Sequence, residues 1–161
     1  MTNFKGNELY IHGSGLKTGI LLTNLGTPDE PNAPSLKTYL RQFLSDGRVI
    51  ETPKAIWWLI LNGIVLRTRP AKSAKAYQSV WTDDGSPLLL YTKKQKNLIK
   101  EQLEKKYPNL VFDIGMRYGN PSIAKSLNNL RNQNCDRIIV LPLYPQYCAA
   151  TTGSTFDAVS M

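Results

Sequence analysis

The sequence predicts an α/β fold in which a Rossmann-like parallel sheet carries helices on both faces. Short apolar runs that end at turns alternate along the chain with longer segments whose apolar residues recur at helical spacing. Parallel strands need such intervening helices for their right-handed crossovers. The length of 161 residues suits one domain. We expect residues 17–161 to form this domain and residues 1–16 to form a flexible N-terminal arm.

Three segments are expected to be strands. Residues 19–25 form an apolar run that ends at a Gly-Thr-Pro turn, and residues 111–118 alternate in polarity and include aromatic side chains. The third run, residues 138–143, is apolar and rich in β-branched residues, which is typical of a strand buried on both faces. We therefore expect this third strand to lie at the centre of the sheet.

The helices are predicted from apolar spacing and from residues that start or stop a helix. Pro34 and Ser35 open a helix that Gly47 stops, Thr52 and Pro53 precede the next, and Asn120-Pro121 begins another. The expected helical segments are residues 34–44, 56–66, 73–81, 88–106, 121–130 and 155–159.

The segment IWWLILNGIVL, residues 56–66, has apolar residues all the way round the predicted helix instead of a single stripe. Two interpretations stay open for so large an apolar surface. Either the helix is buried in the core, or it forms a lip that meets a membrane or a hydrophobic ligand. No apolar run is long enough to span a bilayer, so membrane contact would be peripheral.

The carboxyl end of a central strand opens onto the crevice where α/β proteins bind ligands. Tyr144, Gln146 and Tyr147 are expected to point into that crevice. Residues 151–154 then supply hydroxyl groups just before a predicted helix. They form either an anion site at the helix start or an ordinary capped helix after a loop.

The formal net charge of +8 favours an acidic partner: nucleic acid, anionic lipid or a small polyanion. Lysines cluster in residues 93–105 without interleaved aromatic residues, so we expect no nucleic acid. The N-terminus lacks the apolar region of a secretion signal, and two cysteines cannot build a disulfide framework. These features indicate a cytoplasmic protein.

Standard catalytic motifs are missing from the sequence. There is no P-loop, no GxGxxG follows the first strand, and neither Ser86 nor Ser154 has a histidine partner at a readable spacing. Tyrosines at strand ends, arginines beside loops and the hydroxyl cluster are instead suited to a flat anionic ligand.

Several blocks in the same order resemble the ferrochelatase family, whose members insert ferrous iron into protoporphyrin IX to make protohaem. The resemblance covers nearly all of residues 17–161 and matches the N-terminal half of the family. The blocks are GILLTNLGTP, FLSDGRVIE, SAKAY, GSPLL, GMRYGNPSI and LPLYPQYCAATTGS.

The resemblance implies two Rossmann-like domains with a porphyrin cleft between them, of which this chain would supply the first. It implies that the apolar segment from Trp57 to Leu66 forms a lip for membrane contact and porphyrin entry. By position, eight residues match family residues that line the cleft or contact the porphyrin and its propionates: Leu25, Arg69, Tyr77, Ser86, Arg117, Tyr118, Tyr144 and Tyr147.

The resemblance also implies what this chain lacks. The family's catalytic histidine and glutamate belong to the second half, and we expect neither a catalytic residue nor a metal ligand before Met161. His12 matches no catalytic motif. Ala149 stands where some relatives carry a cluster cysteine, and two cysteines cannot hold a Cys₄ cluster, so we expect no cofactor and no iron–sulfur cluster.

Apolar edges left without the second half favour dimerisation or strand exchange. Two other functions stay open: a porphyrin or haem carrier without chelatase activity, and a flavodoxin-like nucleotide or phosphate binder. The TNLGTP block resembles the branch of the family that uses protoporphyrin rather than coproporphyrin.

Overall fold

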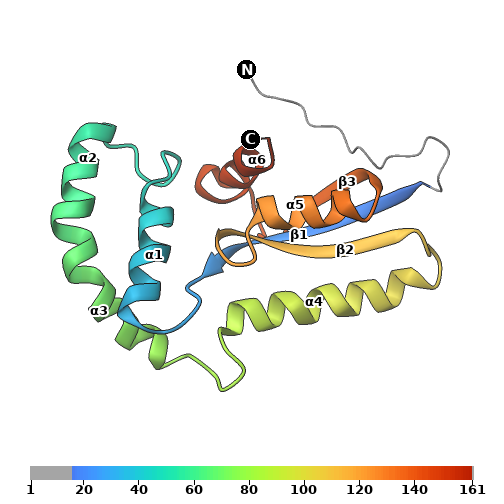
Figure 1. Ribbon diagram of the computed structural model, residues 1–161, viewed down its shortest axis with the longest axis horizontal. Coiled ribbons are helices and arrows are strands. Elements are labelled where there is room, and N and C mark those ends of the chain that lie inside the picture. Colours follow the sequence, from blue (N-terminus) through green and yellow to red (C-terminus); the bar gives the residue numbers. More distant parts are fainter. Residues whose placement is uncertain (1–15, 161) are drawn as a thin grey trace.

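A computed structural model describes residues 16–160, and its centre is a three-stranded parallel sheet (Figure 1). The strands are β1 (Lys17–Thr27), β2 (Leu110–Gly119) and β3 (Cys135–Pro142), in the order β2-β1-β3. Leu22 on β1 pairs with Ile114 on β2 and with Leu141 on β3. The predicted parallel α/β sheet is confirmed. The expected arm and His12 lie outside the described residues, apart from Leu16.

The central strand is β1, so the expectation that residues 138–143 form the central strand is wrong. Within residues 16–160, β3 pairs only with β1. Its Ile138 and Val140 face the core, whereas Ile139 and Leu141 are 47% and 44% exposed. Apolar residues therefore occupy both sides of β3. One side packs on a helix, and the other forms an exposed apolar surface.

Helices lie on both faces of the sheet, as predicted (Figure 1). One face packs against α4 (Pro87–Glu104), and Asn24 on β1 donates a hydrogen bond to Thr92 of α4 over 3.1 Å. The opposite face packs against α5 (Ile123–Asn132) and α6 (Ser154–Ser160). Leu21 and Leu130 are fully buried there, which anchors α5 on the sheet.

The remaining helices lie beyond the carboxyl ends of the strands (Figure 1). Asn32 caps α1 (Ala33–Leu44) by accepting a hydrogen bond from the Ser35 N–H over 2.9 Å. A second helical run packs on α1 and is continuous over α2 (Lys54–Ile60), a π-helical turn η1 (Leu61–Val65) and α3 (Leu66–Gln78). The two helices expected within residues 56–81 are therefore one bent run.

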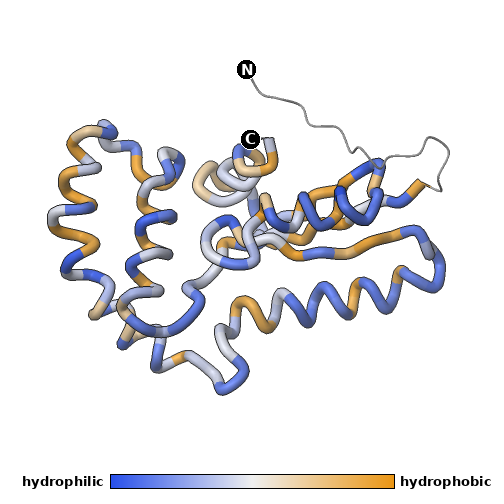
Figure 2. The backbone as a smooth tube through the Cα atoms, viewed as in Figure 1, coloured by the Kyte–Doolittle hydropathy of each residue, from blue (hydrophilic) through white to orange (hydrophobic). Residues whose placement is uncertain are grey.

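The outer side of α2 and η1 is an exposed apolar surface, which we call the lip. Its four residues Ile56, Trp58, Leu59 and Ile64 are 55–64% exposed. On the inner side, Leu61 is buried and the Trp57 indole donates a hydrogen bond to the Leu44 carbonyl over 2.6 Å. Figure 2 shows hydrophobic residues recurring along this run. The interpretation of a wholly buried helix is wrong.

No helix within residues 16–160 has the length and apolar content that a membrane span requires.

Candidate functional site

The carboxyl ends of β1 and β2 are drawn together by two glycines. Gly26 pairs with Tyr118 and has a φ of +107°, and a Cβ placed on it would lie 1.8 Å from the Tyr118 carbonyl oxygen. Gly119 has a φ of +82°, and its Cβ would lie 2.3 Å from the Thr27 carbonyl oxygen. Only glycine tolerates both the left-handed backbone and this approach. The close approach fixes where the side chains beside these glycines project.

A hollow of about 300 Å³ opens beside these strand ends. Three residues expected to contact a porphyrin line it together: Leu25 from the end of β1, Tyr77 from α3 and Ser86 from the turn before α4. Tyr39 and Trp81 complete its aromatic wall. The fold therefore brings together residues that lie up to 61 positions apart in the sequence.

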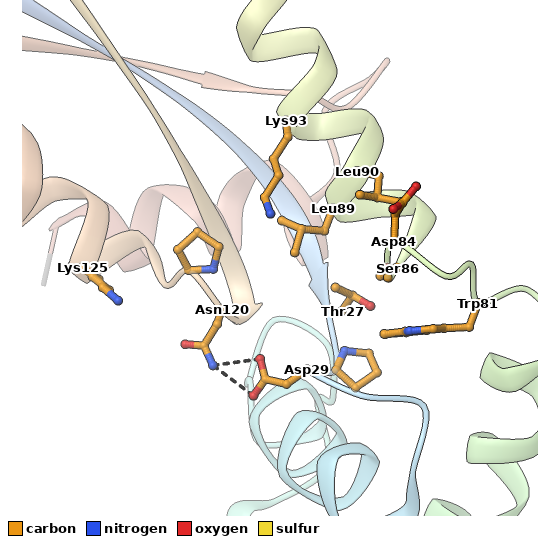
Figure 3. A pocket seen from close by; sticks show the side chains of 13 residues that line it. Thr27, Asp29, Trp81, Asp84, Ser86, Leu89, Leu90, Lys93, Asn120 and Lys125 are labelled. Atoms are coloured by element: carbon orange, nitrogen blue, oxygen red, sulfur yellow. Dashed lines mark hydrogen bonds between the residues drawn. The ribbon is translucent and has the colours of Figure 1, made fainter.

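A second hollow, of about 410 Å³, adjoins the first and shares Thr27, Trp81 and Ser86 with it (Figure 3). Lys93 from α4 and Lys125 from α5 line it on separate elements. The buried Thr27 hydroxyl has no hydrogen-bond partner within residues 16–160. Two ammonium groups in a hollow that also contains the Trp81 ring are suited to a ligand that joins a ring system to carboxylates.

Acidic side chains also line the second hollow. Figure 3 shows the Asn120 amide donating to both oxygens of Asp29, over 2.9 and 3.1 Å. The Asp29 carboxylate is thus occupied by a neighbour from the turn after β2. Asp84 stands on the other wall, in the turn before α4.

The aromatic wall is a chain of ring contacts. The Tyr39 ring lies 6.2 Å from Phe43 and 6.4 Å from Tyr77, measured between centroids, and Phe43 lies 5.1 Å from Tyr118. Burial raises the pKa of Tyr39 and raises that of Tyr118 to about 12. Both phenols therefore stay neutral at physiological pH, and the wall is uncharged.

A polar cluster adjoins the aromatic wall and centres on Asp46. Its Oδ2 atom accepts hydrogen bonds from Arg117 Nη2 over 2.7 Å, Tyr118 Oη over 2.8 Å and Ser154 Oγ over 2.5 Å. Arg117 Nε also donates to Ser154 Oγ over 2.5 Å. The Asp46 side chain is 8% exposed and that of Arg117 is 20% exposed, so the ion pair is largely shielded from water.

Burial alone would raise the pKa of the Asp46 carboxyl. Hydrogen bonds from Ser154, the Arg48 N–H and Tyr118, together with the Arg117 charge, outweigh burial and hold that pKa below its ordinary value. Asp46 is therefore a carboxylate at neutral pH, and its charge offsets that of Arg117.

Two hydroxyls within residues 151–154, those of Thr151 and Ser154, have partners inside the protein. Ser154 is fully buried in the Asp46 cluster, and the Thr151 hydroxyl donates to the Cys148 carbonyl over 3.2 Å. The Gly153 N–H donates to the same carbonyl, within the turn η2 (Ala149–Gly153) that precedes α6. The arrangement fits a helix start after a loop and gives no support to an anion cradle.

The other predicted site residues divide into two groups. Tyr144 is half-buried, and burial raises its pKa against the opposing charge of Arg117, which places it beside the polar cluster. Tyr147 is 70% exposed, with its hydroxyl near Gly153, and Gln146 is exposed as well. Arg69 is exposed on α3 and lines neither hollow.

Sequence reasoning missed several residues of this region: Tyr39, Asp46, Trp81, Lys93 and Lys125. Tyr39 lies within the predicted helix over residues 34–44, and Asp46 directly precedes Gly47, which was interpreted only as a helix stop. Nothing in the spacing links Asp46 to Arg117, 71 positions later. The one available signal was that Asp46 lies inside the block FLSDGRVIE.

The fold and the site together define an α/β domain with two adjoining hollows at the carboxyl edge of its sheet, one with an aromatic wall and one lined by two lysines. The sequence profile of the ferrochelatase family matches residues 17–161. This chain belongs to the ferrochelatase family.

Curated relatives agree with this assignment. A ferrochelatase of Marinobacter nauticus is 51% identical over 158 residues, which cover 98% of this chain and 43% of that protein. A ferrochelatase of Chromobacterium violaceum is 52% identical over 98% of this chain and 43% of its own length, and one of Alcanivorax borkumensis is 52% identical over 98% and 46%. The chain spans less than half the length of these relatives.

Proposed function

We propose that this chain forms the N-terminal porphyrin-binding wall of a ferrochelatase, which inserts ferrous iron into protoporphyrin IX to form protohaem. The observation that carries the proposal is the shared hollow of Leu25, Tyr77 and Ser86. These three residues match porphyrin-contacting positions of the family, and they line one aromatic hollow in a chain that belongs to it.

In this proposal the macrocycle lies against the aromatic wall, and its propionates reach cationic side chains. Tyr77 and Trp81, with ring centroids 6.3 Å apart, would contact the ring edge. Ser86 would donate a hydrogen bond to a propionate, and Arg69 would approach from α3 when the porphyrin is bound. Lys93 and Lys125 extend the positive surface beyond Ser86.

The proposal assigns no proton abstraction to the wall. Removing the two pyrrole protons needs a base of suitable pKa, and delivering iron needs ligands for the metal. By the family resemblance, we propose that the second half of the whole protein supplies both. Ferrous iron is a substrate of the whole enzyme, and we propose that the chain binds no cofactor of its own.

Binding of protoporphyrin IX to the 161-residue chain, followed by the shift of its Soret band, tests the proposal. We expect Tyr77→Ala and Arg69→Ala to weaken binding by about tenfold, since each removes a ring or charge contact worth roughly 1–2 kcal/mol. Lys75→Ala is the matched control, because Lys75 is an exposed cation on the same helix and, unlike Arg69, matches no porphyrin-contacting position of the family.

An assay of zinc insertion into protoporphyrin IX distinguishes a chain that only binds the porphyrin from a complete enzyme. We expect no turnover by this chain. Turnover that Arg69→Ala abolishes would show that the chain carries its own base and would contradict this division of labour. Porphyrin binding without metal insertion by the whole gene product would favour the carrier function. Binding of a nucleotide but not of a porphyrin would contradict the proposal.

We further propose that the protein acts in the cytoplasm and contacts a membrane peripherally through residues 57–66. The lip exposes Ile56, Trp58, Leu59 and Ile64, and the exposed Lys54 and Arg67 flank it. An apolar surface with basic neighbours is typical of helices that lie in the interface of an anionic bilayer.

A further inference from the structure

Asp46 is held rigidly by the turn after α1. Its Oδ1 atom accepts a hydrogen bond from the Arg48 N–H over 2.8 Å. Its own carbonyl accepts from the N–H groups of Val49 and Ile50, each over 3.0 Å. The turn therefore fixes one carboxylate oxygen and leaves Oδ2 for side chains that arrive from β2 and α6.

Arg117 and Tyr118 converge on Oδ2 although they are consecutive residues of β2. Neighbours on a strand point to opposite faces of a sheet, so their side chains normally diverge. Here the Arg117 guanidinium carbon lies 4.8 Å from the centroid of the Tyr118 ring, and both groups donate to the same Asp46 oxygen. A shared acceptor accounts for this convergence.

The convergence has two effects on the aromatic wall. The Tyr118 ring is directed against Phe43 and belongs to the buried cluster against which Leu25 and Tyr77 pack, and these two residues line the first hollow. The positive charge of Arg117 is offset by a carboxylate at 2.7 Å, so the pair carries no net charge.

We propose that Asp46 is a positioning residue of the porphyrin site. It directs the Tyr118 ring into the aromatic wall and neutralises Arg117, so that this part of the cleft presents an uncharged surface to the macrocycle. The propionates are anchored elsewhere. This inference rests on the proposed function. It assigns Arg117 a role other than binding a propionate carboxylate of the porphyrin.

A comparison of two ligands, protoporphyrin IX and its dimethyl ester, tests the inference on the 161-residue chain in one detergent. The ratio of their dissociation constants reports attraction to the propionates. In Asp46→Asn the Arg117 charge is released, so we expect the preference for the free acid over the ester to rise about threefold to tenfold. Ester binding should weaken, because Tyr118 loses its charged acceptor.

The matched control is Glu104→Gln, which removes the carboxylate of an exposed ion pair with Lys100 on α4, outside both hollows. Its acid-to-ester ratio should equal that of the wild-type chain. The double variant Asp46→Asn, Arg117→Gln removes both charges of the pair and also serves if Asp46→Asn does not fold. It should keep the wild-type ratio, since the pair is neutral in both proteins.

The outcomes separate the inference from the function on which it rests. A raised ratio in Asp46→Asn, with wild-type ratios in the control and the double variant, supports the inference. An unchanged ratio in Asp46→Asn overturns it, whether or not both affinities fall together. A double variant that loses preference for the free acid also overturns it, because Arg117 would then be an anchor. A wild-type chain that binds neither ligand contradicts the proposed function and removes the inference with it.

Discussion

Gly26 and Tyr118 face each other across β1 and β2 so closely that a Cβ on Gly26 would lie 1.8 Å from the Tyr118 carbonyl oxygen. This approach is far inside van der Waals contact. It brings the end of β1, which carries Leu25, against the strand that carries Arg117 and Tyr118. The geometry of the cleft therefore depends on the absence of a side chain at Gly26.

Gly26→Ala should destabilise the protein by roughly 3 kcal/mol or more, because the new methyl group overpacks the strand pair at a backbone φ of +107°. Chemical denaturation measures the loss. Gly63→Ala is the control, since Gly63 lies in η1 with nothing within 4 Å of its added Cβ. It should leave stability unchanged or raise it by about 0.5–1 kcal/mol. Equal stabilities for the two variants would contradict the strand contact.

The folded protein should lose stability at acidic pH because the Asp46 carboxyl becomes protonated. The pKa of this carboxyl is lower in the folded protein than its ordinary value of 3.8. Its contribution to folding stability is therefore complete above pH 3.8 and is lost as the pH falls through the pKa of the folded state. Asp46→Asn should cost about 1–3 kcal/mol of folding stability at pH 7 and progressively less as the pH falls below 3.8, because the wild-type protein then loses the stabilising charge itself. Denaturation midpoints from pH 2 to pH 7 give the comparison.

The control for this pH dependence is Glu104→Gln. Glu104 forms an exposed pair with Lys100 at 3.8 Å, which contributes little to stability. Its pH profile should follow the wild type. A difference between Asp46→Asn and wild type that stays constant from pH 2 to pH 7 would show that the Asp46 charge does not stabilise the fold.

The lip should bind anionic lipid vesicles. The double variant Trp58→Glu, Leu59→Glu replaces side chains that are 63% and 64% exposed, so it should reduce vesicle binding at least severalfold and leave the thermal midpoint within a few degrees. Co-sedimentation with vesicles measures this effect. Leu98→Glu, an exposed position on α4, should bind vesicles as the wild type does. Loss of binding in that control, or none in the lip variant, would refute the lip assignment.

The open apolar side of β3 should favour self-association of this chain. The side chains of Ile139 and Leu141 form an exposed apolar face on the edge strand β3, which another copy can cover by dimerisation or strand exchange. Light scattering at high concentration should report a species larger than a monomer. Leu141→Lys should shift it toward the monomer, whereas Tyr91→Lys on α4 should not. A wild-type monomer at every concentration would end the proposal.

Much of the fold follows from the sequence because its strands and helices have distinct apolar periods. The strand predicted over residues 111–118 is β2 (Leu110–Gly119), and the helix predicted over residues 88–106 is α4 (Pro87–Glu104). The order of strands was not predictable in this way. The run of residues 138–143 is the most apolar of the three, but its hydropathy cannot show which strands flank it.

The site was less predictable, because its contacts join distant parts of the chain. The family resemblance pointed to Arg117 and Tyr118, but their common partner Asp46 lies in a turn whose local sequence indicates only a helix stop. Tyr147 was expected in the crevice and is instead 70% exposed. A strand-end pattern indicates that a side chain lies near the crevice, and only the loop conformation decides whether it enters.

The position of β1 between β2 and β3 also bears on how the chain folds during synthesis. The first strand leaves the ribosome before either partner, and it must wait about 80 residues for β2 and more than 100 for β3. Until then its apolar residues Leu21 and Leu22, which end fully buried, have no sheet to join. Nascent chains are thus open to chaperone capture or aggregation until β2 emerges.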